Sequence, residues 1–106
     1  MNANASDAIE HLKSQLAQGG LRPSKDLEKV LFPDLVDYIL SPGKSNASAL
    51  LEKLRFEADQ IKEEPIQNPE YWDKAARQVF DILLSPYLTT IQIYALYAAI
   101  KEHVDD

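Results

Sequence analysis

Residues 91–100, IQIYALYAAI, decide the fold class, because Gln92 is the only strongly polar side chain among them. The run exceeds the usual length of a strand and is rich in good helix formers, so it predicts a helix. A helix that is apolar on nearly every side is buried on most sides. We therefore expect a helix over 89–103 that is central in a small bundle, or that a second subunit partly covers.

Four more helices are expected upstream, from apolar residues that recur at spacings of three and four. The clearest start signal is Asn68-Pro69-Glu70: asparagine caps the helix, proline suits the first helical position, and glutamate suits the positive helix end. Gly19-Gly20 is typical of a helix end. The expected ranges are 7–18, 25–40 with a kink at Pro33, 46–63 capped by Ser45 or Asn46, and 69–84.

These ranges predict an all-α protein, a small helical bundle of about five helices in one domain over residues 1–106, with a flexible tail at 1–6. The 106 residues suit one domain, and 45% of them are hydrophobic, enough for a core. On the outside of the 46–63 helix, two charge pairs are expected at a spacing of four: Lys53 with Glu57, and Arg55 with Asp59.

A short internal similarity raises the question of a repeat. Residues 36–42, VDYILSP, resemble residues 80–86, FDILLSP, at an offset of 44, and a helix is expected after each. If the two copies are stacked helical hairpins, the helices that follow them run parallel. The other interpretation is that an apolar helix ending in Ser-Pro is a common local solution.

The charge balance bears on the class of partner. With 17 acidic and 11 basic side chains, the formal charge is −6, which disfavours nucleic acid and anionic membranes and favours a basic protein. The alternative is that mild acidity only aids solubility. The chain has no cysteine, no apolar run near the roughly 18–20 residues of a membrane span, and no secretion signal at its start. We expect a cytoplasmic protein.

The familiar catalytic patterns are missing from the sequence. There is no glycine-rich phosphate loop, no cysteine nucleophile and no serine elbow motif. His11 and His103 lie near opposite ends of the chain without metal-ligand spacing. We expect no enzymatic activity, no cofactor and no metal.

The most distinctive surface candidate is residues 57–73, which hold six acids and one base. Acids beside exposed aromatic rings are typical of a site where a basic protein docks. The alternative is that the tryptophan points into the core and the acids form a solvated rim. The candidate residues are Glu57, Asp59, Glu63, Glu64, Glu70, Tyr71, Trp72 and Asp73, with Tyr87, Tyr94 and Tyr97 as a second contact or oligomer surface.

The sequence therefore favours a non-enzymatic protein-binding module of the inhibitor, immunity, antitoxin or adaptor type. The alternative is a structural protein that self-associates through its apolar last helix, so both monomer and homodimer are expected states. A third interpretation is a helix-turn-helix DNA binder built around residues 41–46. The helix that follows carries several acids and suits phosphates poorly.

Overall fold

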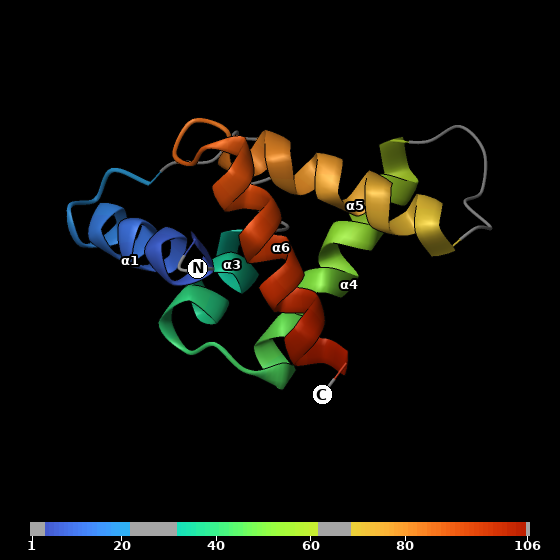
Figure 1. The fold of residues 1–106 in the computed structure, drawn as a ribbon, viewed down its shortest axis with the longest axis horizontal. Helices are drawn as coiled ribbons and strands as arrows, with labels where there is room; N and C mark the ends of the chain where they lie inside the picture. Colours follow the sequence, from blue (N-terminus) through green and yellow to red (C-terminus); the bar gives the residue numbers. More distant parts are fainter. Residues whose placement is uncertain (1–3, 22–31, 62–68, 106) are drawn as a thin grey trace.

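Helix α6 (Thr90–Asp105) packs against three other helices in the computed structural model, which describes residues 4–21, 32–61 and 69–105. Its neighbours are α1 (Asn4–Ala17), α4 (Lys44–Ile61) and α5 (Pro69–Leu84). The short helix α3 (Phe32–Leu40) packs against α4 and α1 (Figure 1). No described residue lies in a strand. The prediction of a small all-α bundle is confirmed.

One face of α6 supplies a large part of the core. Ile93, Leu96 and Ile100 are buried there at spacings of three and four, as a helix that contacts three neighbours requires. The opposite face is open, because the side chain of Ile91 is 68% exposed. The helix is therefore central in its contacts, but it is not covered on every side.

The remaining core comes mainly from the inner faces of α3, α4 and α5, with Ala8 and Leu12 added by α1. Phe80 and Tyr38 are the largest side chains with no exposed surface. On α4 and α5 the buried residues recur at spacings of three and four, so each helix turns one apolar face to the core. The buried members of these two faces are Ala47, Leu50, Leu51, Leu54, Ala58, Ala76, Val79, Phe80 and Leu83.

Two helix ends follow their expected local chemistry. After α1, Gly19 adopts a φ of 71° and donates to the Leu16 carbonyl, while Gly20 donates to the Gln15 carbonyl, which is the pattern that ends a helix with a left-handed residue. Before α6, the Thr89 hydroxyl accepts from the Gln92 backbone N–H at 3.2 Å. The Gln92 side chain in turn accepts from the Thr89 backbone N–H at 3.0 Å.

Other boundaries differ from the predictions by a few residues. The predicted cap Asn46 lies inside α4 and instead donates to the carbonyls of Asp37 and Ser41, at the end of α3, so α4 begins earlier, at Lys44. Pro33 is the second residue of α3, in a first turn where its missing N–H costs nothing. The predicted start of that helix, 25–31, lies outside the described residues.

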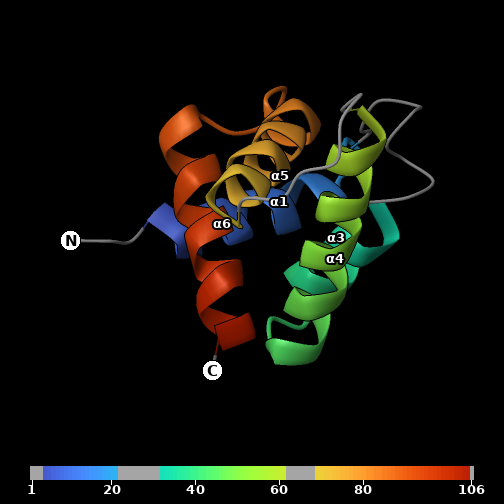
Figure 2. The same cartoon turned by 90° about the vertical axis from the view of Figure 1, so that its right-hand side faces the viewer.

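Of the two interpretations of the internal similarity, the repeat is excluded. It requires the helices after the two Ser-Pro turns, α4 and α6, to run parallel. In both views α4 climbs while α6 descends toward the C-terminus, so the two helices run in opposite directions (Figures 1 and 2). The similar segments therefore represent a common way to end a helix rather than a duplicated hairpin.

The chain is folded to a radius of gyration of 13.1 Å. Within the described ranges, no helix combines the length and the apolarity that a membrane crossing requires.

Candidate partner-binding surface

The outward face of α4 carries an exposed aromatic ring, Phe56, whose side chain is 56% accessible to solvent. Leu54 and Ala58, two residues to either side, are buried, so the helical period turns Phe56 away from the core. Glu52 and Asp59 lie one helical turn before and after the ring, on the same exposed face. The arrangement is an apolar ring flanked by carboxylates.

The acids of this face are not paired with neighbouring cations. The predicted pairs Lys53–Glu57 and Arg55–Asp59 are not formed, since the ion pairs among described residues both involve Asp73. Glu57 is half-buried and Asp59 is exposed. Neither carboxylate is therefore paired with a described cation, and the role of these two residues in partner binding stays a prediction.

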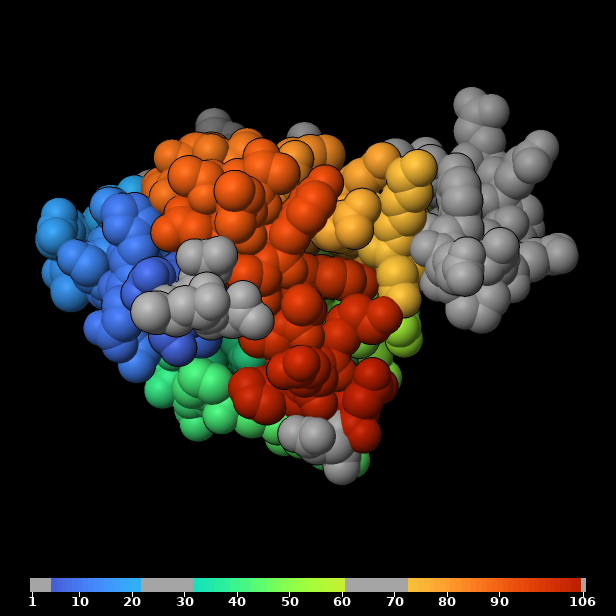
Figure 3. All heavy atoms as spheres, in the orientation of Figure 1, coloured from blue at the N-terminus to red at the C-terminus, as the bar shows by residue number. Residues whose placement is uncertain are grey.

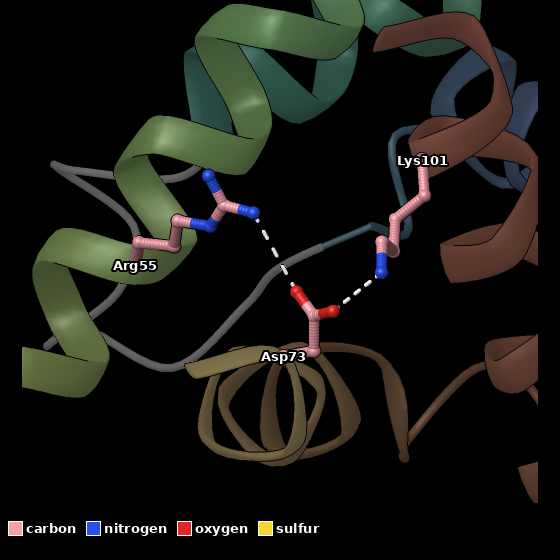
Figure 4. A network of polar contacts seen from close by, with 3 residues as sticks. All are labelled: Arg55, Asp73 and Lys101. Carbon is pink, nitrogen blue, oxygen red and sulfur yellow. Dashed lines mark hydrogen bonds and ion pairs between the residues drawn. The ribbon is translucent and has the colours of Figure 1, made fainter. Parts of the chain in front are cut away.

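Asp73 has a different role, because its carboxylate lies between two cations from different helices (Figure 4). Its Oδ1 is 3.5 Å from the Arg55 Nη2 of α4, and its Oδ2 accepts a hydrogen bond from the Lys101 ammonium of α6. Partial burial pushes the pKa of Asp73 up, but the Lys101 hydrogen bond and the charges of Lys101 and Arg55 outweigh it and hold the pKa below its ordinary value. Asp73 therefore joins α4, α5 and α6, and its charge is largely compensated within the protein.

The other predicted residues of the acidic segment are not placed. Glu63 and Glu64 lie outside the described residues. The backbone of Glu70, Tyr71 and Trp72 belongs to the first turn of α5, but their side chains also lie outside what the structure describes. Whether those two aromatic rings face solvent stays a prediction.

The three predicted tyrosines have distinct environments. Tyr87 is half-buried against the core. Tyr94 is 46% exposed, and the guanidinium of Arg77 lies 4.3 Å from the centre of its ring. Tyr97 is buried, with its ring centre 6.1 Å from that of Phe80. Of the three, Tyr94 is the one with a largely accessible ring, so Tyr94 is the residue of this set suited to an external contact.

Sequence reasoning missed two features. The first is Phe56, which lies just before the acidic segment. Leu50, Leu54 and Ala58 recur every four residues, and Phe56 falls outside this apolar face, so the sequence does indicate that its ring is exposed. The second is a hydrogen bond of 2.9 Å between the buried Tyr38 hydroxyl and Nδ1 of His103. These residues are 65 positions apart, so no local spacing points to their contact.

Comparison of the chain with protein-family models, with curated proteins and with solved structures gave no match.

Proposed function

We propose that the chain is a non-enzymatic protein-binding module that engages a basic protein through the outward face of α4 and the acidic segment that follows it. The observation that carries the proposal is the exposed ring of Phe56 between the unpaired acids Glu52 and Asp59. Inhibitors, immunity proteins, antitoxins and adaptors are the kinds of protein that act in this way without chemistry of their own.

The outward face of α4 offers a partner both an aromatic anchor and the negative electrostatic field of its acids. An exposed aromatic ring loses water on docking and supplies much of the binding free energy in a typical interface. Unpaired carboxylates around the ring speed the encounter with a basic partner and reject acidic ones. Phe56 and its neighbouring acids provide both elements on one rigid helix, which costs little ordering on binding.

The first test is affinity capture from the native lysate with matched baits. We expect the wild-type chain and an Ile82→Ala control to recover the same basic protein, because Ile82 is also exposed, at 59%, but lies on α5. Phe56→Ala should weaken the complex by about 2 kcal/mol, or about thirtyfold, which is the usual effect of losing an aromatic anchor.

A charge variant separates the contribution of the acids to binding from that of the Phe56 ring. Glu52→Gln combined with Asp59→Asn should slow association and flatten its salt dependence while leaving dissociation nearly unchanged. Equal recovery of the partner by the wild type, by Phe56→Ala and by this double variant would reject the proposed surface. Loss with Ile82→Ala alone would move the surface to α5.

A second candidate function, self-association through α6, is favoured by the exposure of Ile91 and Tyr94 one turn apart on its open face. Light scattering over a range of concentrations tests it. If the candidate is right, the wild-type chain forms a dimer and Ile91→Ser shifts it to monomer. A wild-type chain that stays monomeric at every concentration removes this candidate.

A further inference from the structure

A pocket of about 400 Å³ opens to solvent between α5 and α6, a volume within the range of small-molecule sites. The start of α5, in yellow, and the second half of α6, in red, adjoin on the face shown in Figure 3. The described charged residues of its lining are Lys74, Arg77, Lys101 and Asp73. Three cations and one carboxylate leave a local excess of positive charge, in a chain whose formal charge is −6.

The positive charge of the pocket is only partly compensated. Lys101 already binds Asp73, whose other oxygen is close to Arg55. Lys74 and Arg77 form no ion pair with any described residue. These two side chains start three residues apart on α5, so they project from the same face of the helix.

Arg77 is held in place by a contact with an aromatic ring. Its guanidinium lies over the face of Tyr94, which limits the rotation of a long side chain. A guanidinium stacked in this way keeps its edge N–H groups free, and that edge matches two oxygens of a carboxylate or phosphate. The pocket therefore contains a pre-oriented donor for an oxyanion.

Tyr97 also lines the pocket, and its residue is 5% exposed. Its hydroxyl is enclosed by the protein and lies near Asp73, whose charge acts on it. Asp73 is therefore the acceptor available to this hydroxyl within the chain, and Tyr97 forms part of the wall rather than a donor to a ligand.

We propose that this pocket binds the carboxylate or phosphate group of a small organic anion, with Arg77 and Lys74 pairing with the charge and the ring of Tyr94 packing against the organic part. The pocket is distinct from the exposed ring of the proposed partner surface, because Phe56 does not line it, although Asp73 at the end of the acidic segment does. A small molecule rather than a protein side chain is the chosen occupant, since the pocket is of small-molecule size and lies between two helices.

The test uses the whole chain and three probes: inorganic phosphate, acetate and phenyl phosphate. Titrations followed by the NMR signals of Tyr94 and Tyr97 should show saturable shifts, with phenyl phosphate binding more tightly than inorganic phosphate because its ring adds apolar contact. Arg77→Gln should weaken binding about tenfold or more, and Lys74→Gln should weaken it several-fold.

A matched control distinguishes the pocket from general charge. Lys53→Gln removes an equal charge from an exposed position on α4, outside the pocket, and should leave the affinity unchanged. Circular dichroism of each variant checks that it is folded, and Lys74→Gln provides a second pocket variant. The proposal is overturned if no probe gives saturable shifts up to about 50 mM, or if Arg77→Gln and Lys53→Gln weaken binding equally.

Discussion

Phe80→Ala is expected to lower the free energy of unfolding by about 3–5 kcal/mol, which approaches the whole stability of many domains. Phe80 has no exposed surface, and its ring packs against Tyr97 across the α5–α6 contact. Truncation removes this apolar contact and leaves a cavity that rigid helices fill only in part. Urea unfolding followed by far-UV circular dichroism measures the loss.

Ile82→Ala is the matched control for this prediction. Ile82 lies two residues further along α5 but is 59% exposed, so its truncation should change the free energy of unfolding by no more than about 0.5 kcal/mol. A cost below about 1 kcal/mol for Phe80→Ala, or equal costs for both variants, would contradict the placement of α5 against the core.

A strongly alkaline pH is expected to lower the free energy of unfolding. Burial raises the pKa of Tyr38 to about 12, and burial together with the charge of Asp73 raises the pKa of Tyr97 to about 12, from an ordinary value of 10.0. The folded chain therefore keeps both protons at a pH where the unfolded chain releases them. The resulting contribution is complete below pH 10 and is lost as the pH rises toward 12.

The size of the alkaline effect follows from the same shifts. Each pKa unit corresponds to about 1.4 kcal/mol, so each tyrosine accounts for roughly 2–3 kcal/mol of lost stability over this interval. Urea unfolding at a series of pH values measures it. Tyr38→Phe removes one of the two groups, and its stability should fall about half as steeply above pH 10.

The stability of Tyr38→Phe at neutral pH provides a second test of this prediction. Tyr38→Phe also removes the hydrogen bond to His103, so it should start about 1 kcal/mol less stable than the wild type. The two stability curves should then converge as the pH rises. Stability curves that stay parallel would show that ionisation of Tyr38 does not contribute to the loss of stability at alkaline pH.

The parts of the fold that sequence predicted well have strong local signals. Helix α5 begins at Pro69 and ends at Leu84 as predicted, because a proline suits its first position and a Ser-Pro pair follows its end. Helix α4 begins two residues earlier than predicted, and Asn46, one of its two predicted caps, instead binds the end of α3. A capping residue does not reveal from sequence alone which helix end it serves.

The candidate surface was harder to predict because its contacts are not local. A spacing of four favoured Arg55 with Asp59, yet Arg55 lies 3.5 Å from Asp73 on another helix. Asp73 is less exposed than a residue on an open helix face and also binds Lys101, so tertiary packing offers Arg55 a better-positioned partner. The density of acids identified the segment, and the apolar stripe of α4 would have shown that Phe56, just before the segment, is turned away from the core.

Native-state amide hydrogen exchange along α6 is the most direct test of how this helix packs in the bundle. If one face of this helix is held by α1, α4 and α5, the amides of Ile93, Leu96 and Ile100 exchange only through global unfolding. Exchange of these amides as fast as that of Ala5 and Ser6, at the start of α1, would contradict the packing on which both proposed surfaces depend.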